Sequence, residues 1–228
     1  MYYDWTYILV LIGALLSMLA SMRVQRTYDK YARVRSARGL TGREVANYIL
    51  QTNNVQGVTV QHVSGSLTDH YNPTNGTVNL SDVVYGSASV AALGVAAHEC
   101  GHVMQHETGY VPLQIRASLV PIANFGSNVG IWIVIASLLL GLSDNFVNVG
   151  IFLFSFGVLF QLVTLPVEFN ASHRALVMLE EYNLLSPDEV AEAREVLTAA
   201  ALTYVAAAAS SLLQLFRLIL LRNSRRRD

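Results

Sequence analysis

Residues 117–167 decide the fold class and read ASLVPIANFGSNVGIWIVIASLLLGLSDNFVNVGIFLFSFGVLFQLVTLPV. Asp144 is the only charged residue in this stretch. A transmembrane helix needs about 20 mostly apolar residues, so the stretch is long enough for two. Asp144 and its polar neighbours lie where a turn between the two helices would fall. The sequence therefore predicts a transmembrane hairpin over residues 117–167.

Two further segments lack charged residues. Trp5–Met22 predicts an N-terminal transmembrane helix within residues 1–22, with Trp5 and Tyr7 as anchors at the membrane interface. No basic segment precedes it and no clean small-residue cleavage site follows it, so we expect a membrane anchor and not a removed signal peptide. Val196–Phe216 is richer in Ala and Ser. Residues 196–228 are thus expected to form an apolar helix and a basic tail, and this helix either spans the membrane or lies at its interface.

Basic residues are distributed unevenly around these segments. Seven of them follow the first apolar segment, whereas the expected hairpin tip, residues 143–148, has none. Because loops rich in Lys and Arg stay in the cytoplasm, residues 23–116 are expected on the cytoplasmic side and the tip outside. A fourth span would place the basic tail outside, against the same rule, and this is the reason to doubt it.

Overall composition excludes several classes of protein. Charged residues make up 14% of the 228 residues and hydrophobic residues 53%, where soluble proteins carry about 25% charged residues. Such a chain is not intrinsically disordered. Its 15 basic and 16 acidic residues give no basic surplus, so we expect no nucleic-acid partner. One cysteine excludes an intramolecular disulfide and a four-cysteine zinc site.

The predicted cytoplasmic segment, residues 23–116, contains both helix and strand patterns. Residues 40–56 have helical spacing, and Thr41 with Glu44 matches a capping box. Residues 57–65 alternate as a strand does, and residues 76–81 form a second short strand after the turn-rich segment 67–76. The predicted fold is mainly α: an integral membrane helical protein with a small β-ribbon on its cytoplasmic side.

A helix over about residues 88–108 carries the motif with chemical meaning. It contains His98-Glu99-Cys100-Gly101-His102, an HExxH sequence. Residues i and i+4 share one helical face, so His98 and His102 can bind one Zn²⁺. Glu99 is rotated about 100° from His98 and can act as general base on a water without being a ligand. The helix before the motif is apolar, and buried His and Glu side chains need partners.

A catalytic zinc site needs a third protein ligand. The extended motif HExxHxxGxxH is absent, because Gln105 and Thr108 occupy its Gly and last His positions. The acidic residues between 180 and 195 have the spacing of a solvated helix face. Glu168 instead opens an apolar segment directly after the hairpin, and two antiparallel spans return the chain to the side it left. We therefore predict Glu168 as the third ligand, within a segment 168–195 that holds this ligand's helix and a charged helix.

Four stretches together resemble the YugP-type neutral zinc metallopeptidases, membrane proteins of the gluzincin group. They are SGSLTDHYNP (64–73), VAALGVAAHECGH (90–102), GYVPLQIRASLVPI (109–122) and LPVEFNAS (165–172). The resemblance implies one zinc ion per chain, held by His98, His102 and Glu168, with Glu99 as base. The chain is also similar in pattern to the HtpX-like membrane proteases, in which an Asp four residues after the third ligand orients a zinc-bound His. Ser172 occupies that place here.

Several other residues have weaker cases for a role. His70 and its neighbours Asp69 and Tyr71 could border the cleft, His173 could contact substrate, and His106 continues the His98–His102 stripe. The sequence does not decide the roles of His70, Ser172 and His173. Arg116 and Arg174 are expected to anchor the hairpin at lipid headgroups.

The sequence thus predicts a membrane-bound zinc metalloendopeptidase that hydrolyses peptide bonds with zinc-activated water. Its expected partners are the lipid bilayer and protein or peptide substrates, which could themselves be membrane proteins. The alternative is a non-catalytic membrane scaffold or adaptor with a structural zinc site, closed by a fourth protein ligand.

Overall fold

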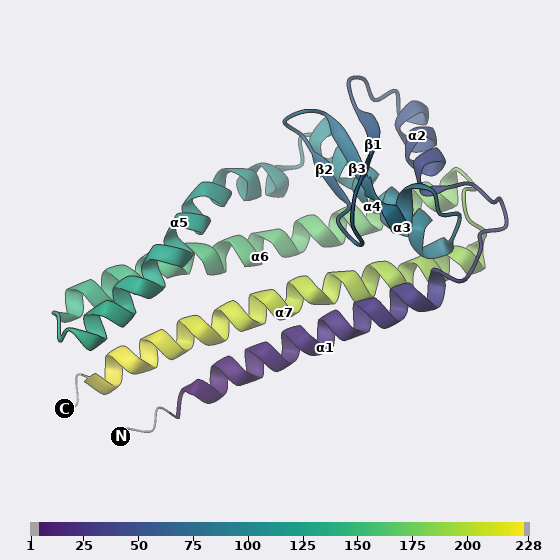
Figure 1. Cartoon of the computed structure of the whole chain (residues 1–228). Coiled ribbons are helices and arrows are strands. Elements are labelled where there is room, and N and C mark those ends of the chain that lie inside the picture. Colours follow the sequence, from purple (N-terminus) through teal and green to yellow (C-terminus); the bar gives the residue numbers. More distant parts are fainter. Residues whose placement is uncertain (1–4, 226–228) are drawn as a thin grey trace. The chain divides into compact units, whose positions relative to one another are not determined.

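The computed structural model describes residues 5–225, which are mainly helical (Figure 1). They divide into two compact units. We call residues up to Ser21, Val111–Pro166 and residues from Leu202 onward the membrane unit. We call Met22–Tyr110 with Val167–Ala201 the site unit.

The membrane unit is built from four long helices, and three of them continue into the site unit. They are α1 (Tyr7–Tyr31), α5 (Val111–Leu139), α6 (Asp144–Glu181) and α7 (Pro187–Arg225). All four are long and apolar enough to cross a membrane. Length and composition therefore allow the predicted apolar helix within 196–228 to span the membrane.

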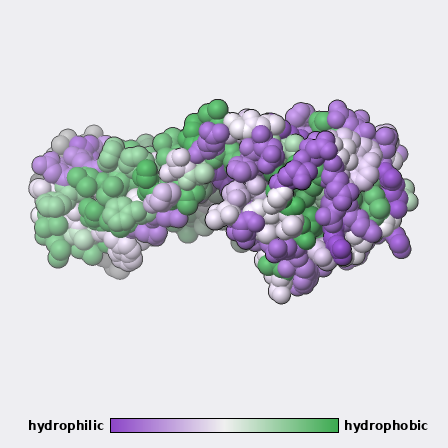
Figure 2. All heavy atoms as spheres, turned by 90° about the horizontal axis from the view of Figure 1, so that it is seen from above, coloured by the Kyte–Doolittle hydropathy of each residue, from purple (hydrophilic) through white to green (hydrophobic). Residues whose placement is uncertain are grey.

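Large apolar side chains cover the outside of the membrane unit. Trp132 is 68% exposed and Leu139 80% exposed, which water would disfavour and lipid tails accept. Figure 2 shows hydrophobic residues gathered over this unit and hydrophilic residues over the site unit. Inside the unit, Val134, Val147 and Leu218 form a small buried cluster joining α5, α6 and α7.

Small residues let the helices of the membrane unit approach closely. A Cβ atom at Gly130 would lie 2.6 Å from the carbonyl oxygen of Gly150, so α5 and α6 touch backbone to backbone. Between α1 and α7, the hydroxyls of Ser17 and Ser210 both donate to the carbonyl of Gly13. In lipid the hydrophobic effect does not drive helices together, so small-residue contacts and interhelical hydrogen bonds stabilise their packing.

The site unit has its own hydrophobic core. Helices α2 (Gly42–Thr52), α3 (Asp82–Tyr85) and α4 (Val90–Glu107) pack with the site-unit parts of α6 and α7 around buried Val, Leu, Ile and Ala side chains. The predicted capping box of α2 is confirmed, because the Thr41 hydroxyl accepts from the Glu44 N–H and the Glu44 carboxylate accepts from the Thr41 N–H.

The sheet differs from the two-stranded ribbon that the sequence predicts. It has three strands, β1 (Thr59–Val63), β2 (His70–Asn72) and β3 (Thr77–Ser81), in the order β1-β3-β2. The turn around Asn75-Gly76 pairs β2 with β3 in antiparallel fashion, and β1 pairs with the other edge of β3 in parallel. The segment predicted only as turn thus contains a strand, because its turn residues flank three residues that complete the hairpin.

The long helices also run past the predicted limits. Residues 168 and 196 lie inside α6 and α7, where the sequence predicts new elements. Pro166 interrupts the backbone hydrogen bonding of α6, but no glycine follows to end the helix, so α6 carries the chain from the membrane unit to Glu168 without a break.

Candidate metal centre

Helix α4 presents His98 and His102 on one face. The helix begins at the N-cap Ser89, whose hydroxyl accepts from the Ala92 N–H, and ends just before Gly109, whose φ of 62° fits the glycine expected after a helix end. The two imidazole rings lie 4.8 Å apart, edge to face. Their partner on the facing helix is Glu168 of α6.

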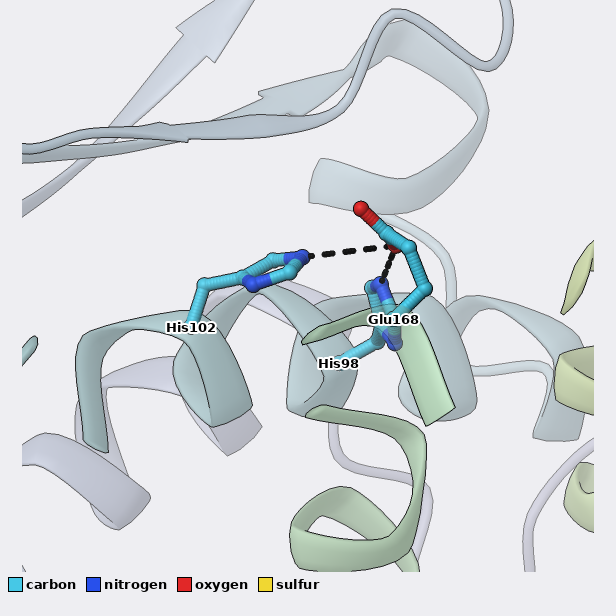
Figure 3. Close-up of side chains that lie close together, drawn as sticks. All are labelled: His98, His102 and Glu168. Carbon is cyan, nitrogen blue, oxygen red and sulfur yellow. Dashed lines mark ion pairs between the residues drawn. The ribbon is translucent and has the colours of Figure 1, made fainter. Parts of the chain in front are cut away.

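Glu168 directs its carboxylate at both imidazoles (Figure 3). Its Oε2 atom lies 3.3 Å from Nε2 of His98 and 3.6 Å from Nε2 of His102. The Glu168 side chain is 2% exposed, and the histidine side chains 15% and 12%. Within residues 5–225, these three form the only group of at least three His, Cys, Asp or Glu side chains close enough to hold a metal ion.

The three side chains fit zinc by type and by spacing. Two ligands about 2.1 Å from a tetrahedral ion lie about 3.4 Å from each other, close to the Glu168–His distances. Imidazole nitrogen and carboxylate oxygen are ordinary zinc ligands. A carboxylate this deeply buried needs a positive partner, which a bound cation supplies. The sequence predicts these three residues as ligands, and the structure brings them together.

Gly101, inside the HExxH motif, allows the two helices to meet. A Cβ atom at this position would overlap the carbonyl oxygen of Ala171 on α6. The contact holds the backbones of α4 and α6 together three residues beyond Glu168. The HExxH motif allows any residue at this position, so the sequence alone does not show that glycine is required here.

Each histidine hydrogen-bonds through its other ring nitrogen. Nδ1 of His98 lies 3.1 Å from the Ser172 hydroxyl, and Nδ1 of His102 lies 3.0 Å from Oε1 of Gln105. Both Nε2 atoms are thereby directed at Glu168. Burial disfavours the charged form of His102, but hydrogen bonding to Glu168 and the charges of Glu99 and Glu168 outweigh it and raise the pKa of this imidazole.

Glu99 lies beside the candidate ligands and is held by strand β2. Its side chain is nearly buried, and its Oε2 accepts a hydrogen bond of 2.9 Å from the backbone N–H of Tyr71. Tyr71 also contacts α4 through its hydroxyl, 3.2 Å from Nδ1 of His106. The outer edge of β2 thus faces the metal centre and fixes the carboxylate that the motif predicts as base.

The remaining candidates make other contacts. His70 is exposed and hydrogen-bonds through Nδ1 to the carbonyl of Thr68, and His173 is exposed. Asp69 accepts from the N–H and the hydroxyl of Ser81, which is turn chemistry. Arg174 donates from Nε to Oδ1 of Asn170, so it belongs to the hydrogen bonds behind the site.

The arrangement of two imidazoles and a carboxylate around one point, with a second glutamate next to the first histidine, is the one expected of HExxH zinc peptidases. Comparison with known proteins agrees. Residues 6–223 match the family described as "Putative neutral zinc metallopeptidase", and the chain belongs to this family. It is 44% identical to "Putative membrane protease YugP" of Bacillus subtilis, over 94% of this chain and 96% of that protein. No solved structure matches the chain.

Proposed function

We propose that this chain is a membrane-bound zinc endopeptidase in which His98, His102 and Glu168 hold one zinc ion and Glu99 is the general base. The observation that carries the proposal is the convergence of the three ligand-type side chains next to a nearly buried Glu99. A bound zinc ion would polarise the scissile carbonyl and make an attacking water more acidic.

Residues of the chain transfer the proton and orient the groups that take part. Glu99 accepts a proton from the attacking water and delivers it to the leaving amine. The backbone N–H of Tyr71 keeps the Glu99 carboxylate in place for both steps. Ser172 and Gln105 orient the imidazoles from behind.

The Glu99→Gln variant tests the mechanism. The amide oxygen still accepts from Tyr71, but glutamine cannot carry the proton, so hydrolysis should fall by about 10²–10⁴-fold while zinc content stays at the wild-type level. Peptide cleavage and bound zinc are measured on purified protein in detergent. Glu107→Gln, at the exposed end of the same helix, is the matched control and should cleave as the wild type does. Undiminished cleavage by Glu99→Gln would contradict the proposed base.

A scaffold with a structural zinc would give a different result. Structural sites are closed by four protein ligands, whereas catalytic sites keep one position for water. X-ray absorption at the zinc edge should show two imidazoles, one carboxylate and a water. Four protein ligands together with absent cleavage would assign the zinc to structure.

We further propose that the site faces the cytoplasm and that substrates include membrane proteins. The excess of basic residues directly after the first apolar segment supports the side. The place of Glu168 in the chain supports the substrates, because it directly follows the apolar residues 145–167 within the same helix. Membrane proteomes of cells expressing the wild type or Glu99→Gln should differ in cleaved membrane proteins, and identical proteomes would count against this substrate class.

A further inference from the structure

Gln105 is a completely buried amide one turn after the HExxH motif. Its side chain has an exposed fraction of 0%, and its amide hydrogen-bonds to residues of α4 and α6. Oε1 faces Nδ1 of His102 at 3.0 Å. Nε2 donates to the backbone carbonyl of Val167 at 2.7 Å and to Oδ1 of Asn170 at 3.0 Å. Gln105 therefore connects a candidate ligand on α4 with the residues on both sides of Glu168 on α6.

The partners of Gln105 fix which way its amide points. The carbonyl of Val167 can only accept a hydrogen bond, so the NH₂ group must face it. Asn170 gives the same answer independently. Nε of Arg174 can only donate, and it lies 2.9 Å from Oδ1 of Asn170, so that oxygen is an acceptor for Gln105 as well. The amide oxygen of Gln105 must then face His102.

This orientation determines the tautomer of His102. An amide oxygen only accepts, so Nδ1 of the imidazole must carry the hydrogen. In the neutral ring Nε2 is then the nitrogen with the free lone pair, and Nε2 is the atom directed at Glu168. A neutral imidazole can bind a metal only through the nitrogen that lacks hydrogen.

We infer that Gln105 is a positioning residue that locks His102 in the Nδ1–H tautomer, with Arg174, Asn170 and the Val167 carbonyl as the fixed end of the chain of hydrogen bonds. This inference deepens the proposed function, on which its consequence for zinc rests. The inference also distinguishes His102 from His98. His98 is backed by the hydroxyl of Ser172, which can donate as well as accept, so this contact leaves both tautomers of His98 open.

The first measurement is zinc affinity, by competition with a chelator on purified, detergent-solubilised protein. Gln105→Leu keeps the size of the side chain and loses the hydrogen bonds, so the affinity should fall by about 10–100-fold, the usual effect of losing an outer hydrogen-bond partner. Asn170→Asp should retain the affinity, since a carboxylate oxygen accepts from Gln105 and Arg174 equally well. Asn170→Leu should weaken it. Gln51→Leu, on the exposed side of α2, is the matched control and should bind zinc as the wild type does.

The second measurement reads the tautomer without metal. The chain has six histidines, so selective ¹⁵N-histidine labelling in alkaline buffer gives few signals, and His102→Asn assigns the relevant pair. The wild type should show His102 as Nδ1–H, and Gln105→Leu a mixture of tautomers. An unchanged tautomer in Gln105→Leu, or an Nε2–H ring in the wild type, would overturn the inference. A wild-type protein that binds no zinc would overturn the proposed function, and the tautomer signals would still decide the inference.

Discussion

Gly101 has no side chain at a point where the backbones of α4 and α6 nearly touch. The candidate ligand His102 is the next residue in the sequence, and the oxygen that Gly101 faces belongs to Ala171, about one turn from Glu168 on α6. The distance between the imidazoles and the carboxylate therefore depends on the absence of a single methyl group. The residue types of the HExxH motif and Glu168 made them recognisable as candidate ligands in the sequence, whereas a packing requirement for glycine is not visible in the residue types.

Gly101→Ala should damage the site without altering a ligand. The added methyl group would overlap the Ala171 carbonyl and push α6 away, which we expect to lower stability by about 1–3 kcal/mol and to weaken zinc binding. Thermal unfolding in detergent and zinc titration measure the two effects. Gly94→Ala, two turns earlier on α4, places its methyl group 3.5 Å from Cβ of Ala193 in ordinary contact, so it is the matched control. Equal zinc affinity in both variants would argue against the role of Gly101.

Glu168→Gln should remove zinc almost completely. The amide keeps the shape of the carboxylate but loses the charge that a buried cation requires. Because zinc binds the folded state, the wild type should also unfold at a lower temperature after chelation, whereas Glu168→Gln should be insensitive to the chelator. Glu181→Gln, at the exposed end of the same helix, should retain both the metal and the chelator response. A full zinc complement in Glu168→Gln would exclude this residue as a ligand.

At the scale of elements, sequence patterns predicted the apolar helices, the α2 capping box and the HExxH helix well. Each depends on residues that are close in the sequence. The apolar helices follow from segments without charged residues, the capping box from a Thr and a Glu three residues apart, and the end of the HExxH helix from Gly109. The pairing of β1 with β3 and the continuity of α6 through Glu168 rest on contacts between distant segments. Gln105 was visible only as a departure from an extended motif, because its partners Val167 and Asn170 lie far along the chain.

The α5–α6 hairpin should be sensitive to one added methyl group. In Gly130→Ala the new Cβ atom would lie 2.6 Å from the Gly150 carbonyl oxygen and 2.7 Å from the Phe154 nitrogen, both rigid backbone atoms. Overpacking of this kind costs about 1–3 kcal/mol, so the variant should unfold at a lower temperature in detergent. Gly86→Ala meets nothing within 4 Å and serves as the control. Equal melting of the two variants would show that the hairpin helices adjust freely.

At the scale of the whole molecule, the contacts within the membrane unit show which helix ends lie together. The end of α7 lies next to the start of α1 and next to the hairpin tip. The guanidinium of Arg217 lies over the Tyr7 ring at 4.2 Å, and Leu218 packs with Val147 near the tip. The second half of α7 therefore runs the length of this unit. In a bilayer, the basic end of α7 and the tip should emerge on one side.

Single cysteines test this topology in a Cys100→Ala background. Asn145→Cys at the tip and Asn223→Cys near the end of α7 should react with a membrane-impermeant maleimide on intact cells. Gln56→Cys, between α2 and β1, should react only after permeabilisation. The seven basic residues between 23 and 43, which follow the first apolar segment, give the direction, and they outweigh the basic end of α7. Labelling of Asn145→Cys without Asn223→Cys would show that α7 does not span the membrane.

Under the proposed function, the continuity of α6 bears on where a substrate is cut. Glu168 directly follows the charge-free residues 145–167 within the same unbroken helix. Very little chain therefore separates the proposed ligand from the apolar part of α6. A protein anchored in the same bilayer would be cut in the few residues that leave its own membrane helix. Each cut would release a soluble domain and leave a short anchored stub, so the expected outcome is shedding rather than complete degradation.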